Sequence, residues 1–177
     1  MIVDDPSNAA DRSVSLEAAF EENFDDLYRF AVRRVGESPA EDAVAETFAR
    51  AVSRYPSFDS ERGSVRAWLF GIETNVLREV LRARSRERRP VPEARAGTEW
   101  EREVEGVETA LELRSALDGL PRRSVELLLL VDGFALSYRE AATAIGIPVG
   151  TVRSGLSIAR RRLRRALGSG SSQRGTT

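Results

Sequence analysis

The chain has 177 residues, of which 41% are hydrophobic and 31% charged, with a formal net charge of −1, as expected for a globular protein with one domain or two small ones. It has no Cys and no His, which excludes disulfides, zinc fingers, thiol nucleophiles and a Ser-His-Asp triad, and we expect no metal or other cofactor. No apolar run reaches the roughly 20 residues that cross a bilayer, and the start does not resemble a signal peptide, so we expect a cytoplasmic protein without a membrane span.

The N-terminal part predicts a disordered lead followed by an amphipathic helix. Residues 1–15 are polar and acidic and show no periodicity, so we expect them to be disordered. From Leu16 onward apolar residues recur every three or four positions, with acidic residues on the other side, until Gly36 ends the pattern. A first helix is therefore predicted from Leu16 to the residue before Gly36.

A second helix is predicted from Ser38 and Pro39 to Tyr55, because Ser-Pro signals a helix start and Val44, Phe48 and Val52 repeat at helical spacing. Its exposed side carries three acids, Glu41, Asp42 and Glu46. As charges near a helix N-terminus they also suit the helix dipole, so the pattern alone leaves their role open.

A turn-rich loop at 56–64 precedes the third predicted helix, and it contains one aromatic residue, Phe58. The helix starts near Ser64, with Trp68 on its inward side, and its C-terminal half is strongly basic. Six Arg and two Glu lie between residues 78 and 89, which is more positive charge than the end of a helix dipole needs. The sequence thus predicts a cationic rod after the loop.

A linker is predicted at 90–105, where Pro, Gly and Glu mix without an apolar repeat. It separates a first domain at 16–89 from a second at 106–167, in which three helical patterns precede the C-terminal one. Residues 127–131 are apolar on every side, so their helix is expected at the centre of the second core. Residues 168–177 are expected to form a flexible tail. The predicted fold class is all-α.

Residues 137–167 predict a helix-turn-helix. Ser137 and Glu140 have the spacing of a capping box, while Gly146 and Pro148 mark a short turn before the last helix. One face of that helix carries the apolar residues Val152, Leu156, Ala159 and Leu163. The opposite face carries the polar residues Arg153, Ser154, Ser157, Arg161, Arg164 and Arg165.

Periodicity alone fits a solvated helical hairpin equally well. The charge favours a nucleic-acid interface instead, because residues 137–167 contain seven Arg and one acid, a local charge of +6 in a chain of net charge −1. The residues by themselves therefore predict a two-domain, all-α, DNA-binding protein.

Four segments resemble one family more closely: AEDAVAETFARAV, FDSERGSVRAWLFGIETNVLRE, LPRRSVELLLLVDGFALSYREAA and GIPVGTVRSGLSIARRRLRRAL. They are similar to the extracytoplasmic-function (group 4) sigma factors of bacterial RNA polymerase, over about residues 16–167. The resemblance implies a sigma-2 domain that opens the −10 promoter element, a sigma-4 domain that binds the −35 element, and control by an anti-sigma factor. It implies no catalysis.

The resemblance also implies roles for individual residues. Glu41, Asp42 and Glu46 would face the clamp helices of the largest subunit of core RNA polymerase. The expected −10 contacts are Phe58 and Asn75, which would hold a flipped base, and Arg78, Arg82 and Arg84, which would follow the phosphates. The expected −35 contacts are Tyr138, Arg139, Thr151, Arg153, Ser154, Arg160 and Arg161. By the same resemblance, Trp68 is expected mainly in the core.

The last helix departs from the family at Gly155, Ser157 and Ile158, where basic or bulky residues are common. We expect weakened −35 binding, which Arg at positions 155 and 158 would restore. A stand-alone helix-turn-helix regulator remains the second hypothesis, and the motifs of the first domain distinguish the two. A small helical enzyme ranks third, since the carboxylates show no catalytic spacing.

Overall fold

The structure is a computed structural model of the chain. It describes residues 6–61, 63–86 and 107–171, with side chains described from residue 16 to residue 168 outside 62 and 87–110. Within these ranges the regular structure is helical and contains no strand, which confirms the predicted fold class. The predicted linker at 90–105 and residues 172–177 of the predicted tail lie outside the described residues. Residues 168–171, where the flexible tail was predicted to begin, are helical.

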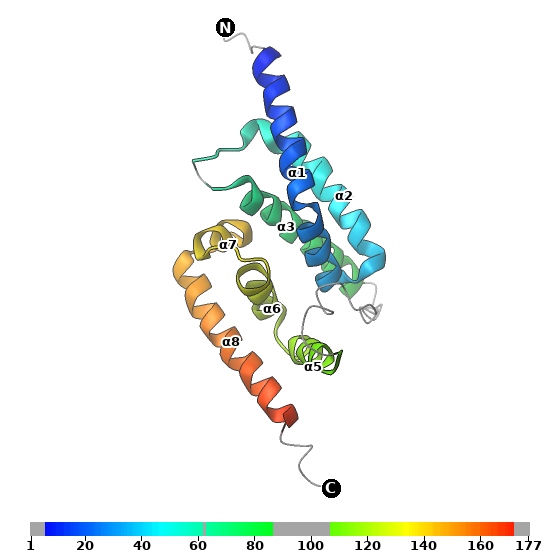
Figure 1. Cartoon of the computed structure of the whole chain (residues 1–177), viewed down its shortest axis with the longest axis vertical. Helices are drawn as coiled ribbons and strands as arrows, with labels where there is room; N and C mark the ends of the chain where they lie inside the picture. The colour runs from blue at the N-terminus through cyan, green and yellow to red at the C-terminus, as the bar shows by residue number, and fades with distance from the viewer. Residues whose placement is uncertain (1–5, 62, 87–106, 172–177) are drawn as a thin grey trace. The chain divides into compact units, whose positions relative to one another are not determined.

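The helices form two compact units. The first unit contains α1 (Pro6–Val35), α2 (Glu37–Arg54), the 3₁₀ turn η1 (Tyr55–Ser57) and α3 (Val65–Arg86). The second contains α5 (Val107–Asp118), α6 (Arg122–Leu128), the π-helical turn η2 (Leu129–Gly133), α7 (Tyr138–Ile145) and α8 (Val149–Ser171) (Figure 1). None of these helices has the length and hydropathy that a membrane crossing requires.

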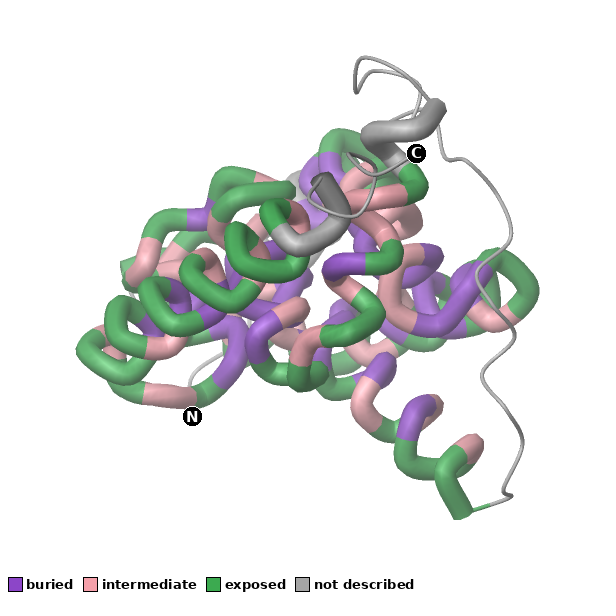
Figure 2. The backbone as a smooth tube through the Cα atoms, turned by 90° about the horizontal axis from the view of Figure 1, so that it is seen from below, coloured by how far each residue is buried: buried purple, intermediate pink, exposed green. Residues whose placement is uncertain are grey.

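In the first unit, α1 and α2 lie side by side as a helical hairpin, and α3 packs against both (Figure 1). The hairpin turns at Gly36, whose φ of +84° favours glycine over residues with a side chain. The largest side chains of its core, all fully buried, are Leu27, Phe30, Leu69, Phe70 and Leu77. The buried stretches of each helix are marked along the backbone in Figure 2.

Helix α1 begins at Pro6, ten residues before the start predicted at Leu16. The prediction used the apolar repeat, which begins at Leu16. The backbone instead follows local propensity, because Pro suits a first helical turn and the sequence has no Gly or Pro between residues 7 and 35. The expectation of disorder over 1–15 therefore does not match the helix from Pro6 onward.

The second unit contains the predicted helix-turn-helix. The Ser137 backbone N–H donates to Glu140 Oε2 at 2.8 Å and the Glu140 N–H donates to Ser137 Oγ at 3.2 Å, which is the predicted capping box. Gly146 ends α7 with a φ of +73°. Residues 127–130 are buried, and so are Val152, Leu156 and Ala159 of α8, which confirms the predicted core of this unit except at Val131 and Leu163, which are half-buried.

Candidate nucleic-acid interface

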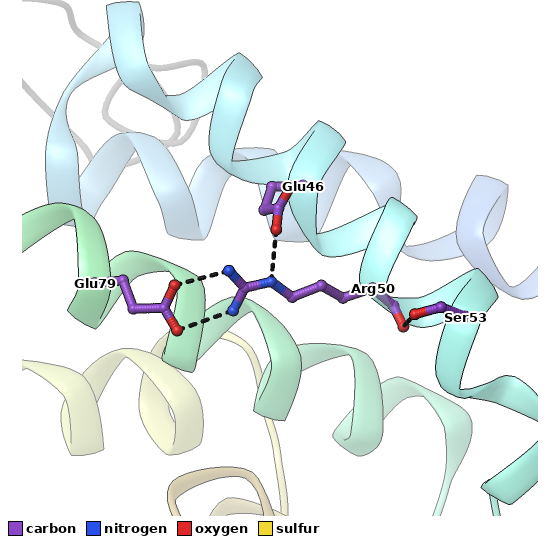
Figure 3. A network of polar contacts seen from close by, with 4 residues as sticks. All are labelled: Glu46, Arg50, Ser53 and Glu79. Carbon is purple, nitrogen blue, oxygen red and sulfur yellow. Dashed lines mark hydrogen bonds and ion pairs between the residues drawn. The ribbon is translucent and has the colours of Figure 1, made fainter.

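The acidic side of α2 is exposed, as the sequence predicted, but its three acids differ in their surroundings. Glu41 and Asp42 are exposed. Glu46 accepts a hydrogen bond from Arg50 Nε at 2.7 Å, and the other two guanidinium nitrogens of Arg50 donate to both carboxylate oxygens of Glu79 on α3, at 2.9 and 2.7 Å (Figure 3). The bonds to Glu79 and Glu46 raise the pKa of Arg50, and Arg50 lowers the pKa of Glu79. Glu46 therefore belongs to a network that joins α2 to α3.

Phe58 lies in an aromatic cluster between η1 and the start of α3. Its ring centroid is 5.8 Å from that of Tyr55 and 5.1 Å from that of Trp68, and all three residues are half-buried. Ser64 caps α3, since its Oγ accepts the Ala67 N–H at 3.2 Å. Trp68 was expected mainly in the core, whereas it shares this partly exposed cluster with Phe58.

One face of α3 continues from this cluster. Trp68, Asn75 and Arg82 are seven residues apart, so they share a face and follow one another at roughly 10 Å along the helix. Asn75 and Arg82 are exposed. Arg78 Nη1 donates to Asn75 Oδ1 at 3.5 Å, which places a guanidinium beside the amide. An aromatic platform, an amide and cationic groups thus follow each other on one surface.

Arg84 is bonded to another helix of the protein and is not positioned as a phosphate contact would be. It is half-buried, and its Nη1 donates to the carbonyl of Val35 at 2.6 Å. Val35 is the last residue of α1, and the last carbonyls of a helix have no partner inside it. In the structure Arg84 therefore caps α1, while Arg86, two positions further on α3, is exposed. Sequence spacing gave no signal for this cap, because the two residues are 49 positions apart.

The outer face of α8 agrees with the predicted polar face. The residues Arg153, Ser154, Ser157, Arg161, Arg164 and Arg165 are all exposed, as is Thr151. On α7, Arg139 is exposed and Tyr138 is half-buried. Arg162 is exposed as well, and a helix with five exposed arginines and one buried apolar side is suited to lie along a groove lined with phosphates.

Arg160, a predicted DNA contact, is held by Asp132 of η2. Its Nε donates to Asp132 Oδ2 at 3.0 Å, its Nη2 donates to Oδ1, and its Nη1 reaches the Tyr138 hydroxyl at 3.5 Å. The hydrogen bonds to Asp132 are the main cause of a raised pKa of Arg160. This arrangement fastens α8 to the segment before α7. Asp132 was not predicted, since nothing in its sequence neighbourhood points to a partner 28 residues away.

Gly155 is half-buried at the margin of the outer face, next to α6, and a DNA contact by Arg at this position stays a prediction. A Cβ added at Gly155 would lie 2.8 Å from Leu127 Cδ1 of α6. Helical spacing could have predicted this, because position 155 lies three residues after Val152 and four before Ala159, both fully buried. The glycine allows α8 to approach α6.

Replacing Gly155 by Arg is expected to lower the free energy of unfolding of the second unit by roughly 1 kcal/mol. The new Cβ must displace the buried Leu127 side chain, which costs about 1 to 3 kcal/mol, while the loss of a glycine from a helix interior returns about 1 kcal/mol. Chemical denaturation of the full chain followed by circular dichroism would measure the change. Ser157→Arg is the matched control, since Ser157 is exposed on the same helix and should leave stability unchanged. Equal stability of both variants would contradict the close packing of Gly155 against Leu127.

Comparison with known proteins assigns the two units. A family model described as sigma-70 region 2 matches residues 19–87, and one described as sigma-70 region 4 matches residues 110–163. The sigma factor SigC of Mycobacterium tuberculosis is 34% identical over 153 residues, which cover 82% of this chain and 80% of that protein. EcfG of Rhodopseudomonas palustris is 35% identical over 139 residues, with 77% and 76% covered.

Solved structures agree in fold. RpoE from Bartonella quintana, in complex with the anti-sigma factor NepR, matches with a TM-score of 0.69 at 24% identity, covering 87% of this chain and 97% of that one. CnrH, in complex with the cytosolic domain of CnrY, matches with a TM-score of 0.66 at 25% identity, covering 89% and 90%. The match of the first unit to sigma-70 region 2 disfavours a stand-alone regulator, whose first domain would sense a ligand or dimerise. The two family models cover more than half of the chain in the family's own order, and the chain belongs to the extracytoplasmic-function sigma factors, which direct bacterial RNA polymerase to promoters.

Proposed function

We propose that this sigma factor holds the −10 strand on the face of α3 that begins at Phe58 and the −35 duplex on the outer face of α8, while α2 binds the clamp helices of core RNA polymerase. The observation that carries the proposal is the row formed by the Phe58 and Trp68 rings, Asn75 and Arg82. Such a row combines the three groups that single-stranded DNA requires: a stacking surface, a hydrogen-bonding amide and a cation.

The −10 role is best supported for Phe58, Asn75, Arg78 and Arg82. A flipped base can stack on a half-exposed aromatic ring and bond its edge to the exposed Asn75 amide, while Arg82 neutralises a phosphate. Arg84 is set aside from this group, because its guanidinium bonds the Val35 carbonyl. The exposed Arg86 is the better candidate for a phosphate at that end of α3.

The −35 role is best supported for Arg139, Thr151, Arg153, Ser154 and Arg161, all of them exposed on α7 or α8. Arg paired with guanine is the commonest specific contact in a major groove. Tyr138 and Arg160 contribute at most indirectly to DNA binding, because Arg160 donates hydrogen bonds to Asp132 and to the Tyr138 hydroxyl and these bonds orient α8.

The clamp-facing role rests on the exposed acids of α2. Charge reversal of both Glu41 and Asp42 to Arg is expected to weaken binding to core polymerase at least tenfold, because acidic residues complement a basic coiled coil and reversal adds repulsion. Glu46 is left out, since it is bonded to Arg50. Affinity capture of core polymerase by the parent and by this double variant would measure the effect.

The control for this prediction is reversal of Glu17 and Glu21, a pair of exposed acids on α1. It changes net charge by the same amount without altering α2. Loss of binding that is equal in both double variants would mean that total charge, and not the α2 surface, determines the affinity.

We also infer that an anti-sigma factor binds this chain and prevents its use by the polymerase. RpoE and CnrH, which share its fold, were solved in complex with NepR and with the cytosolic domain of CnrY. A factor of this kind performs no catalysis itself and acts where the polymerase meets the chromosome, in the cytoplasm. Pull-down from the native cell, with identification of a small stoichiometric partner, tests this inference.

The whole proposal is tested by run-off transcription from genomic promoter fragments with purified core polymerase. Specific transcripts should require this protein and should share −10 and −35 sequences. If the protein binds promoter DNA without core polymerase and represses transcription, the proposal fails.

A further inference from the structure

Ile158 is an exposed apolar residue on a surface that is otherwise polar and cationic. It is 40% exposed, one of four large hydrophobic residues described as exposed. Helical spacing aligns it with Ser154 one turn before and Arg161 one turn after, and both are exposed. The apolar side of the same helix, formed by Val152, Leu156 and Ala159, is buried and does not include it.

The neighbours of Ile158 leave its side chain prominent. Ser154 and Ser157 are short, and Gly155 faces α6. Ile158 is therefore the largest side chain on the second and third turns of the outer face, apart from the guanidinium groups of Arg153 and Arg161. Its arginine surroundings complement phosphate, which favours duplex DNA over an apolar protein partner as the occupant of this face.

In the major groove the apolar group that a base pair offers is the C5 methyl of thymine. An exposed aliphatic side chain cannot form hydrogen bonds with base edges, so it distinguishes bases by burying this methyl. It also leaves a guanine or adenine acceptor without a hydrogen bond at the same place. Such a residue selects thymine through apolar contact.

We propose that Ile158 is a specificity-determining residue that selects thymine at one position of the −35 element by contact with its methyl group. The proposal rests on the proposed placement of α8 in the −35 major groove. The difference from the family at position 158 then gives a different base preference, and not the loss of a phosphate contact. Replacement of Ile158 by Arg would then alter the preferred sequence instead of restoring affinity.

The experiment uses the full chain assembled with core RNA polymerase. Promoter duplexes with a randomised −35 segment are selected for binding, and the best duplex is remade with deoxyuridine in place of each thymidine in turn. Uracil pairs as thymine does and lacks only the methyl. At one position the substitution should weaken binding by the parent about fourfold, and at the other positions it should have little effect.

The Ile158→Ala holoenzyme should bind the thymine and uracil duplexes equally at that position. Ile158→Val should retain part of the difference, and Ser157→Ala, a neighbouring exposed residue, should retain all of it. Because Ile158 is exposed, each variant should unfold at the same denaturant concentration as the parent.

Three results would overturn the proposal: a selected −35 element without thymine, uracil tolerated at every position by the parent, or an undiminished uracil effect in Ile158→Ala. Weaker binding of Ile158→Ala to core polymerase or to an anti-sigma factor, with no methyl effect, would instead assign the residue to a protein interface. Failure of the holoenzyme to select any −35 sequence would count against the proposed function itself, and is thereby distinguished from failure of this inference.

Discussion

Replacing Glu73 by Gln is expected to stabilise the first unit at pH 8.5 by about 3 kcal/mol and to leave its stability at pH 5 nearly unchanged. Glu73 lies on α3 and is fully buried, and among the described residues neither of its carboxylate oxygens has a hydrogen-bond partner. Burial raises the pKa of Glu73 from 4.5 to about 7, and the nearby Thr47 hydroxyl of α2 opposes this rise only in part. The Thr47 oxygen itself is buried without a hydrogen bond.

The direction of the pH effect follows from proton binding. Since the folded-state pKa of Glu73 lies above the unfolded value, the folded chain holds more protons between pH 4.5 and about 7. The free energy of unfolding therefore falls as pH rises through this window, and it stays at the lower level above it. Gln cannot ionise, so the variant should lose this pH dependence.

Denaturant unfolding at pH 5 and pH 8.5 would measure the effect. Trp68 reports on the first unit, and replacing Trp100 by Phe removes the other tryptophan. Glu79→Gln is the control on the same helix, because the pKa of Glu79 is lowered and its contribution changes only at acidic pH. If the parent protein has the same free energy of unfolding at pH 5 and pH 8.5, ionisation of Glu73 does not destabilise the folded state.

The sequence predicted best what local rules determine. The capping box at Ser137 and Glu140, the turn at Gly146 and the apolar face of the last helix all involve residues within a few positions of each other. For the same reason Ser64 could be expected to start α3. Such interactions join residues that are close in sequence, so the pattern alone located both candidate DNA-binding helices.

The sequence did not predict contacts between distant elements. The binding of Arg84 to Val35, of Arg160 to Asp132 and of Arg50 to Glu79 links residues 28 to 49 positions apart. In a chain whose basic residues are all Arg, composition cannot distinguish an arginine that holds helices together from one that is free to meet phosphate. Glu73 was likewise not identified, because a single acid on an otherwise apolar helix face has no periodic signature.

Replacing both Phe58 and Asn75 by Ala is expected to reduce promoter opening by about 30- to 1000-fold while leaving closed-complex binding nearly unchanged. A stacked base contributes roughly 1 to 3 kcal/mol, and a hydrogen bond to its edge adds about 1 kcal/mol. Both interactions exist only after the base has left the duplex, so they stabilise the open complex alone. Potassium permanganate reactivity of −10 thymines measures opening, and a gel-shift assay with heparin omitted measures closed-complex binding.

Two controls separate base capture from damage to the fold. Phe58→Tyr keeps a stacking ring and the packing against Tyr55 and Trp68, so it should open promoters nearly as well as the parent. Phe24→Ala removes an exposed aromatic residue from α1 and should not affect opening. If the double variant opens the −10 region as fully as the parent, Phe58 and Asn75 do not capture a flipped base, and the proposed −10 role of this face of α3 loses the two groups on which it depends.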